Sequence, residues 1–270
     1  MPFSETAYAK INLALHVRGK RDDGYHDIET LFAFVDNGDR LVAEPAERDT
    51  LTTLGEFAQA LDNPFGNLVM RALNALPREQ GLAVTLEKNL PIAAGLGGGS
   101  ADAGAVFRMI EQSFALPDDW QLRAERLGAD VPSCIRSEMA IGRGTGTQLE
   151  SVENDLAGTA VLLVNPRIPL PTAPVFKAWD GEDRGALPEG TAREIARKGR
   201  NDLRAPAIAI CPSIADILGE LAADDPFQAE MSGSGATCFA LYDDTQARDA
   251  AAARIAEAHP EWWQMKGKLR

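Results

Sequence analysis

The chain has 270 residues, of which 40 are acidic and 27 are basic, so its formal net charge is −13. This length predicts two domains, and the absence of a lysine- and arginine-rich stripe argues against a nucleic-acid partner. No apolar run reaches membrane-spanning length and the first residues do not form a targeting signal, so we expect a cytoplasmic protein without membrane association.

The first elements are expected to be two strands. Apolar and polar residues alternate over Ala9 to Val17 and again over Thr30 to Phe34, and the turn-rich stretch Gly19 to Gly24 between them predicts a hairpin. Lys10 and Asn12 stand two positions apart and therefore share one face of the first strand, where both could meet a ligand. A solvent-exposed strand lysine is the competing interpretation of Lys10.

A glycine loop follows in a strand-to-helix context. The helical pattern Asn67 to Leu76 and the alternating strand Leu82 to Leu86 precede the segment Pro91 to Asp102, which reads PIAAGLGGGSAD, and a second helical pattern runs to Phe114. Consecutive glycines let backbone amides approach a ligand closely, and Ser100 is placed to cap a helix whose N-terminus favours anions. The loop therefore predicts a phosphate site.

Two better-known glycine motifs are excluded. In the dinucleotide-binding pattern G-x-G-x-x-G, Ser100 or Asp102 would occupy the position of the last glycine. The Walker A pattern fails because no lysine follows the glycines. A structural turn or flexible tether is the remaining alternative, and it is less favoured because an apolar strand and an amphipathic helix bracket the loop.

The second half of the chain predicts a new mixture of strands and helices. We place the domain boundary near residue 155, after a polar stretch, and expect Asp180 to Arg200 to be a mobile surface connection. The segment Met231 to Ala236, MSGSGA, is either an ordinary turn or a second phosphate-facing loop. The remaining expected elements are a helix over Gln121–Leu127, a strand over Thr159–Val164, a proline-rich loop over Pro166–Pro174, a helix over Ile214–Leu221, a strand over Thr237–Tyr242 and a helix over Thr245–Ala258.

The cysteines and histidines do not form a metal-binding pattern. Cys134, Cys211 and Cys238 have no metal-like spacing and are expected to be small buried apolar residues. The three histidines are scattered along the chain and include no closely spaced ligand pair. No zinc site is therefore predicted.

Three of these segments together resemble the three motifs of the GHMP kinases, in the same order and spacing. Two further elements, Gly-Tyr-His and Gly-Ala-Asp-Val-Pro, are similar to those of the branch that acts on a cytidine diphosphate substrate. The resemblance covers most of the chain. Its motifs are Ala9–Leu13 (AKINL), Asp23–His26 (DGYH), Asn67–Val69 (NLV), Gly95–Ser100 (GLGGGS), Gly128–Pro132 (GADVP) and Ser232–Ala236 (SGSGA).

The resemblance implies a fold and an activity. The fold would be the α+β two-domain GHMP kinase architecture, with an ATP-binding ribosomal protein S5 domain 2-like domain over residues 1–155 and a ferredoxin-like domain over 156–270 that contributes to the substrate cleft. The activity would be ATP-dependent phosphorylation of the 2-hydroxyl of 4-(cytidine 5'-diphospho)-2-C-methyl-D-erythritol in the non-mevalonate isoprenoid pathway. Mg²⁺ is expected with ATP. Its ligands and the oligomeric state are left open.

Residue roles follow from the same resemblance. Lys10 and Asp130 match the catalytic pair. Tyr25 and Phe176 would clamp the cytosine while His26 hydrogen-bonds its polar edge. The predicted ATP-binding residues are Asn67, Pro91, Ile92, Ala93, Ala94, Gly95, Leu96, Gly97, Gly98, Gly99, Ser100 and Ala101, and the predicted substrate-binding residues are Asn12, Tyr25, His26, Phe176 and Gly235.

Two alternatives stay open at this point. Another GHMP kinase with a different small alcohol as acceptor would carry the same glycine loop. A metabolite-binding homologue without turnover would keep the fold, although the presence of both Lys10 and Asp130 argues against it. The chain also departs from the family pattern at Gly144 to Thr147, where a glutamate is often found, so no role is assigned to that segment.

Overall fold

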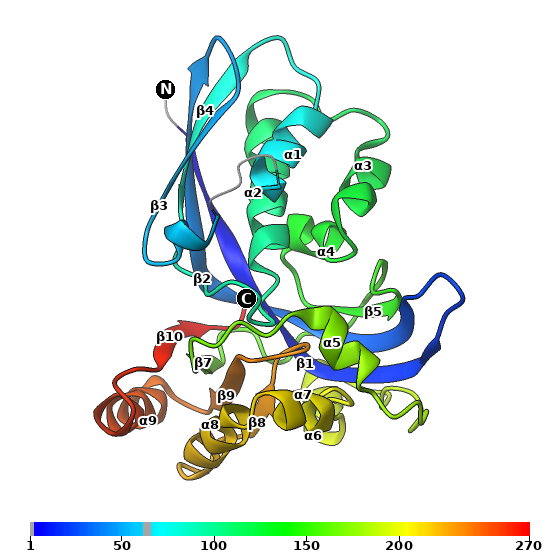
Figure 1. Ribbon diagram of the computed structural model, residues 1–270, viewed down its shortest axis with the longest axis vertical. Helices are drawn as coiled ribbons and strands as arrows, with labels where there is room; N and C mark the ends of the chain where they lie inside the picture. The colour runs from blue at the N-terminus through cyan, green and yellow to red at the C-terminus, as the bar shows by residue number, and fades with distance from the viewer. Residues whose placement is uncertain (1–2, 62–65) are drawn as a thin grey trace. The chain divides into compact units, whose positions relative to one another are not determined.

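The computed structural model describes residues 3–61 and 66–270 (Figure 1). The chain forms two compact units. Unit 1 comprises Met1–Lys10, Asn37–Ile92 and Gly97–Ser137, and unit 2 comprises Ile11–Asp36, Ala93–Leu96 and Glu138–Arg270. Each unit is thus assembled from separate stretches of chain, and the single boundary near residue 155 stays a prediction.

The predicted N-terminal hairpin is confirmed, and its strands are longer than expected. Strand β1 (Phe3–Lys20) pairs with β2 (His26–Ala46), and both pass from one unit into the other. The turn is closed by a hydrogen bond from the Arg21 amide to the Tyr25 carbonyl at 2.8 Å. Gly24 has a φ of +87° in this turn, a conformation that favours glycine.

The described part of unit 1 combines the second half of β2 with two further strands and four α-helices. β2 pairs antiparallel with β4 (Gly81–Glu87), which pairs in parallel with β3 (Thr50–Leu54). The helices are α1 (Leu68–Ala75), α2 (Gly98–Ser113), α3 (Trp120–Leu127) and α4 (Val131–Arg136), and a short 3-10 helix covers Ala58–Leu61. They form the helical group beside these strands in Figure 1.

Helices α2 and α4 approach each other closely at Gly104. A Cβ atom at this position would lie 2.7 Å from the carbonyl oxygen of Cys134, a distance that real Cβ atoms do not adopt. Glycine therefore lets the two backbones touch. This contact holds α4 against α2, the helix that follows the glycine loop. It thereby also fixes Asp130, the residue directly before α4.

Unit 2 contains the first half of β2 and a separate four-stranded sheet. β2 pairs with β5 (Ala140–Gly144), and β5 pairs with β6 (Gln148–Ser151), both antiparallel. The second sheet is antiparallel, with the order β10-β7-β9-β8. Its strands are β7 (Ala160–Asn165), β8 (Gln228–Met231), β9 (Cys238–Tyr242) and β10 (Trp263–Lys268).

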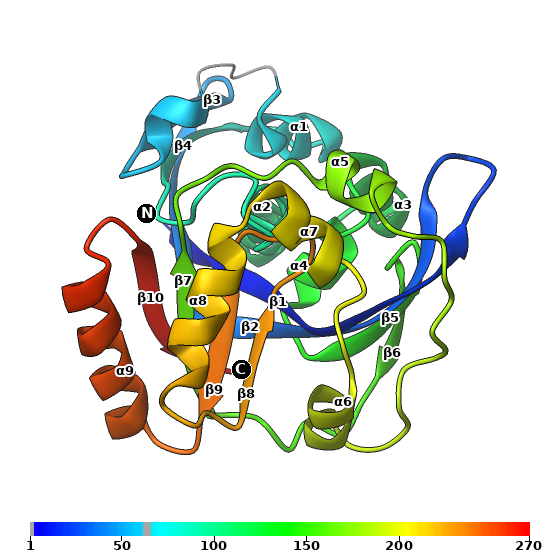
Figure 2. The ribbon, with the colours of Figure 1, turned by 60° about the horizontal axis from the view of Figure 1, so that its bottom comes forward.

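Two helices cover one face of this second sheet (Figure 2). Apolar residues of α8 (Ser213–Ala222) and α9 (Thr245–Ala258) share a core with alternate residues of β7 and β9. The helix α7 (Arg204–Ile210) contributes to the same core. Four strands in this order with two helices on one side form the predicted ferredoxin-like arrangement.

Several elements escaped the sequence patterns. The strands β3, β5, β6, β8 and β10 and the helices α4 and α7 were not predicted. Helix α5 (Thr172–Lys177) begins inside the stretch that was expected to be a proline-rich loop. These elements are short, and polar or glycine-containing strands lose the alternation that marks a half-buried strand.

The segment predicted as a mobile connection is instead fastened to its own unit. Asp183 pairs with Arg18 of β1 at 2.8 Å, and the Leu187 amide donates to a carboxylate oxygen of Glu29 at 2.8 Å. The segment then enters helix α6 (Ala192–Lys198), and Thr191 and Glu194 form a capping box at the N-terminus of this helix. Asp183 and the backbone amide of Leu187 therefore anchor the segment to the hairpin, and sequence periodicity does not reveal such contacts.

The cysteine prediction is confirmed, because all three thiols are buried and unpaired with one another. Burial raises the pKa of Cys134 to about 12, so this thiol stays protonated. Throughout residues 3–61 and 66–270, no helix combines the length and the apolar character that crossing a membrane requires.

Candidate active site

In unit 1 the side chains of Lys10 and Asp130 form an ion pair. The Lys10 Nζ lies 3.0 Å from Asp130 Oδ2, and the side chains are 5% and 35% exposed, respectively. The lysine is thus enclosed by protein while the carboxylate keeps one side open to solvent. The structure brings together the two residues that the sequence assigned to catalysis, and it excludes the alternative of a solvated strand lysine.

The local sequence leaves the Asp130 carboxylate available. Asp130 is the residue before α4, but its side chain makes no capping hydrogen bond to that helix. Pro132, which lacks an amide hydrogen, lies in the first turn of α4, where the missing donor costs little. The backbone carbonyl of Asp130 accepts from the Ser133 hydroxyl at 2.8 Å, which fixes the start of the helix.

The second half of the glycine loop lies against Lys10. Gly97 has a φ of +60° and precedes helix α2, and a Cβ atom on it would lie 2.9 Å from Lys10 Cε. The predicted capping role of Ser100 is wrong, because α2 begins at Gly98 and Ser100 already lies in its first turn. Its hydroxyl faces Gly128, where a Cβ would come within 3.9 Å of the Ser100 oxygen. The N-terminal amides of α2 and the catalytic pair thus belong to one part of unit 1.

The first half of the loop lies in unit 2, against the second glycine-rich segment. A Cβ atom on Gly95 would lie 2.3 Å from the carbonyl oxygen of Ser232, so only glycine fits this approach. The Ser232 hydroxyl donates to the Gly95 carbonyl at 2.7 Å, and the Thr237 amide donates to the Ala94 carbonyl at 3.1 Å. The segment Met231 to Ala236 therefore braces the glycine loop, and its role as a second phosphate-facing loop stays a prediction.

Asn12 belongs to the same part of unit 2. It is 3% exposed, its amide donates to the Ser232 hydroxyl at 3.2 Å, and its side-chain nitrogen donates to Thr30 Oγ1 at 2.7 Å. The side chain of Asn201 donates to the carbonyls of Met231 and Gly233, at 2.8 Å each. Sequence reasoning missed Thr30 and Asn201, since a single threonine or asparagine carries no pattern.

An aromatic cluster surrounds His26 in unit 2. The His26 ring centroid lies 5.0 Å from that of Phe176 and 5.7 Å from that of Trp179, the latter contact being edge-on. Tyr25, by contrast, is 63% exposed. Burial lowers the pKa of His26 from its ordinary value, and Lys20 lowers it further. Trp179 was missed, although it stands three residues after Phe176 and so on the same face of a helical turn.

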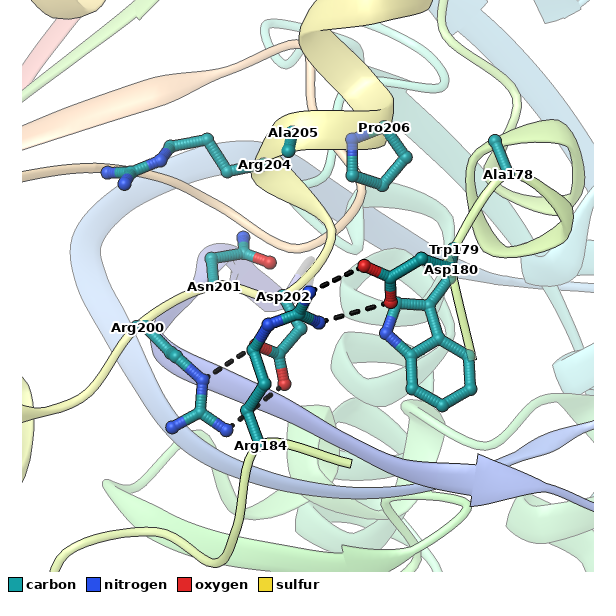
Figure 3. Close-up of a pocket in the computed structure, with 10 residues that line it drawn as sticks. All are labelled: Ala178, Trp179, Asp180, Arg184, Arg200, Asn201, Asp202, Arg204, Ala205 and Pro206. Carbon is teal, nitrogen blue, oxygen red and sulfur yellow. Dashed lines mark hydrogen bonds and ion pairs between the residues drawn. The ribbon is translucent and has the colours of Figure 1, made fainter. Parts of the chain in front are cut away.

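A pocket of about 330 Å³ opens beside this cluster in unit 2, with Trp179 in its wall (Figure 3). Its arginines are each paired with a carboxylate. Arg184 pairs with Asp180, Arg200 with Asp202 and Arg204 with Glu230. The charge of the lining is therefore largely balanced, and no sequence-predicted site residue lines it. The lining residues are Ala178, Trp179, Asp180, Arg184, Arg200, Asn201, Asp202, Arg204, Ala205 and Pro206.

Asn67 has a clear structural role. It precedes α1, and its side-chain oxygen accepts a hydrogen bond from the Val69 amide at 2.9 Å, which is the geometry of an N-cap. Its place in an adenine pocket stays a prediction. Within the described part of the chain, no group of three or more histidine, cysteine, aspartate or glutamate residues is arranged to hold a metal ion.

Two segments match kinase family descriptions, which defines the class of protein. Residues 67–138 match "GHMP kinases N terminal domain", and residues 184–261 match "GHMP kinases C terminal". The crystal structure of a homoserine kinase from Cytophaga hutchinsonii has the same fold, with a TM-score of 0.66 at 15% identity over 96% of this chain and 95% of that one. The fold is that of a GHMP kinase, as predicted.

Curated relatives narrow the class to one family. A 4-diphosphocytidyl-2-C-methyl-D-erythritol kinase from Erythrobacter litoralis is 73% identical, with 99% of each chain covered. One from Novosphingobium aromaticivorans is 64% identical over 100% of this chain and 94% of its own. A crystal structure of 4-(cytidine 5'-diphospho)-2C-methyl-D-erythritol kinase matches with a TM-score of 0.83 at 33% identity, covering 99% of both chains. The chain belongs to the 4-diphosphocytidyl-2-C-methyl-D-erythritol kinase family.

Proposed function

We propose that this chain transfers the γ-phosphoryl group of ATP to the 2-hydroxyl of 4-(cytidine 5'-diphospho)-2-C-methyl-D-erythritol, giving the 2-phosphate and ADP. The observation that carries the proposal is the ion pair between Lys10 Nζ and Asp130 Oδ2, which are 3.0 Å apart. This pair lies beside Gly97, the residue directly before α2. The choice of acceptor is supported by the printed names of the relatives, which match this chain over nearly its whole length.

Asp130 is proposed to orient the acceptor and take its proton. The hydroxyl oxygen then attacks the γ-phosphorus while the bond to the β,γ-bridging oxygen breaks, so that ADP leaves and the proton stays on the carboxylate. Lys10 holds a positive charge 3.0 Å from Asp130, where it keeps the carboxylate in place and neutralises charge on the transferred group. Phosphoryl transfer depends mainly on such positioning and charge neutralisation.

The glycine loop is proposed to bind the triphosphate. The first amides of α2 are not used by the helix itself, and the helix dipole adds to their attraction for anions. When bound, Mg²⁺ would neutralise charge on the phosphates. A hydroxyl such as that of Ser100 is a suitable oxygen ligand for this ion.

We propose that unit 2 binds the cytidine end of the substrate. His26 and Phe176 offer a face of aromatic rings, and the exposed Tyr25 lies directly before His26 on the hairpin. Stacking on such rings suits a nucleobase, because every base presents a π-face. Asn12 and Gly235 are the proposed contacts to the remainder of the substrate. A small-molecule reaction of this kind also fits the predicted cytoplasmic location.

The test is a comparison of acceptors. The purified chain is incubated with ATP, Mg²⁺ and the cytidylylated methylerythritol, and in parallel with mevalonate, homoserine or galactose, while ADP release and the position of the new phosphate are measured. We expect turnover with the cytidine substrate alone and phosphate at the 2-hydroxyl. Turnover with another alcohol would identify a different GHMP kinase. ATP binding without any turnover would indicate a metabolite-binding homologue.

A further inference from the structure

Asn201 in unit 2 is a buried asparagine whose side-chain amide makes three hydrogen bonds. The residue is 6% exposed and forms part of the wall of the pocket in Figure 3. Its Nδ2 donates to the carbonyls of Met231 and Gly233, at 2.8 Å each, and its Oδ1 accepts from the Leu203 amide at 2.9 Å. An amide nitrogen carries two hydrogens, so both are used on one short segment of backbone.

Strand β1 holds the backbone on both sides of Asn201. Asn201 forms an isolated parallel bridge with Leu15. The Leu15 amide donates to the Arg200 carbonyl at 2.8 Å, and the Asp202 amide donates to the Leu15 carbonyl at 2.9 Å. The Asp202 carboxylate also accepts from the Val17 amide at 2.8 Å. The side chain of Asn201 is therefore mounted on a fixed stretch of backbone, from which it can hold another segment in place.

The segment that Asn201 holds has little rigidity of its own. It reads MSGSGA over 231–236, and Gly233 and Gly235 have φ angles of +56° and +85°. Glycine loses the most conformational freedom on folding, so such a segment needs contacts from outside to keep one conformation. The two carbonyls that Asn201 binds belong to the residues on either side of Ser232. Asn201 therefore limits how far Ser232 can move.

Ser232 is in turn a contact between this segment and the glycine loop. Its hydroxyl donates to the Gly95 carbonyl at 2.7 Å and accepts from the Asn12 amide at 3.2 Å. The approach is close, because a Cβ atom on Gly95 would lie 2.3 Å from the Ser232 carbonyl oxygen. A displacement of Ser232 would therefore be passed on to Gly95.

We propose that Asn201 is a positioning residue for ATP, which fixes the segment Met231 to Ala236 and, through Ser232, the Gly95 carbonyl of the glycine loop. This inference rests on the proposed function only in that the glycine loop binds a nucleotide. Asn201 is not proposed to touch ATP itself. It acts through its two N–H donors, so a side chain of the same shape without these donors should fail to replace it.

The first experiment measures binding of a non-hydrolysable ATP analogue by calorimetry, which gives both the affinity and the fraction of chains that bind. Asn201→Asp keeps the shape of the side chain and the acceptor for the Leu203 amide, but it places an oxygen against the two carbonyls. We expect a roughly 10-fold weaker affinity in Asn201→Asp and in Asn201→Ala, with a binding fraction close to that of wild type. Impaired folding alone would lower the binding fraction and leave the affinity of the remaining chains unchanged, which would overturn the proposal.

Asn154→Asp is the matched control in the same unit. Asn154 is exposed, its Oδ1 accepts from the Leu156 amide at 3.2 Å, and its Nδ2 donates to the Arg270 carbonyl at 2.9 Å. The control thus makes the same chemical change in the same kind of turn, but its lost donor serves the last residue of the chain instead of the segment Met231 to Ala236. Asn154→Asp should bind the analogue as tightly as wild type.

The second experiment tests whether Asn201 acts through Ser232. Ser232→Ala removes the hydroxyl that donates to Gly95 and should also weaken analogue binding roughly 10-fold. Because both residues act on Gly95, the double variant Asn201→Ala/Ser232→Ala should bind about as weakly as either single variant, and not roughly 100-fold more weakly than wild type. Additive losses would overturn the proposal, as would wild-type affinity in Asn201→Asp. Since analogue binding needs no acceptor, a wrong acceptor assignment in the proposed function would leave both experiments intact.

Discussion

The ammonium of Lys10 lies 3.0 Å from one carboxylate oxygen of Asp130, and both side chains belong to the same compact unit. The pair joins residues that are far apart in the chain, one on β1 and the other directly before α4. Its geometry matches what proton abstraction from an alcohol requires, namely a carboxylate held in place and partly open to solvent.

Asp130→Asn should lower kcat by roughly 10² to 10⁴, because the amide keeps the shape of the side chain but cannot accept the proton. The KM for ATP should change little, since Asp130 is not proposed to bind the nucleotide. Steady-state kinetics on both substrates would test this. Asp118→Asn, an exposed carboxylate in the same unit, is the control. A near-normal kcat in Asp130→Asn would remove this residue from the mechanism.

Gly97→Ala should impair both the nucleotide and the catalytic lysine. The left-handed backbone at φ +60° costs an alanine about 1 kcal/mol, and the new methyl group would lie 2.9 Å from Lys10 Cε. We expect a higher KM for ATP and a lower kcat, with a smaller change in the KM for the cytidine substrate. Gly219→Ala in α8 is the matched control, because nothing lies within 4 Å of its Cβ position and its φ is not positive. Uniform losses in Gly97→Ala would indicate unfolding instead.

Local patterns were sufficient for the elements whose burial alternates regularly. Strand β4 buries Leu82, Val84 and Leu86 in strict alternation, and α9 begins and ends where its pattern predicted. Strand β10, by contrast, reads Trp-Gln-Met-Lys-Gly-Lys and is defined by its pairing with β7. That pairing is a tertiary contact, which no window of local sequence contains.

In the candidate site, too, residues that stand in sequence motifs could be predicted, whereas residues that only the fold brings together could not. Lys10, Asp130 and the glycine loop were found because they stand in motifs of fixed order. A buried ion cluster, in which Lys88 contacts Asp39 and Asp102, was not found, because Lys88 is separated from Asp39 by 49 positions and from Asp102 by 14. Each of the three is an unremarkable charged residue in its own neighbourhood, and only the fold brings them together. Trp179 escaped because it belongs to no motif or periodic pattern, although it stands three residues after Phe176.

Phe176→Ala should weaken binding of the cytidine substrate. Stacking of a base on an aromatic ring is worth about 1 to 3 kcal/mol, so the KM for this substrate should rise roughly 5- to 150-fold. Tyr25→Ala should have a similar effect if the exposed Tyr25 closes over the base, and neither change should alter the KM for ATP. Trp262→Ala is the control, because that aromatic ring stacks on His259 instead. Normal binding by both folded variants would exclude the aromatic clamp.

His26 gives the last prediction, on the acid side. Burial and Lys20 lower its pKa below the ordinary value of 6.5, so the imidazole is neutral at pH 7 and one ring nitrogen can accept a hydrogen bond. Protonation at lower pH removes that acceptor, which should raise the KM for the cytidine substrate several-fold between about pH 7 and 5. The stability of the folded protein should also decrease on acidification. Because the folded-state pKa is lowered, this contribution to stability is present above pH 6.5 and is lost as the pH falls toward the folded-state pKa.

His26→Gln should remove the acid rise in KM, since glutamine can accept a hydrogen bond at every pH in this range but does not titrate. His259→Gln is the control, because His259 stacks on Trp262 and is not part of the aromatic cluster around His26. KM measurements at constant ionic strength keep screening of the charged substrate unchanged across the series. If the KM fell on acidification in the wild type, the imidazolium would be the better partner for the substrate, and His26 would act as a donor to it.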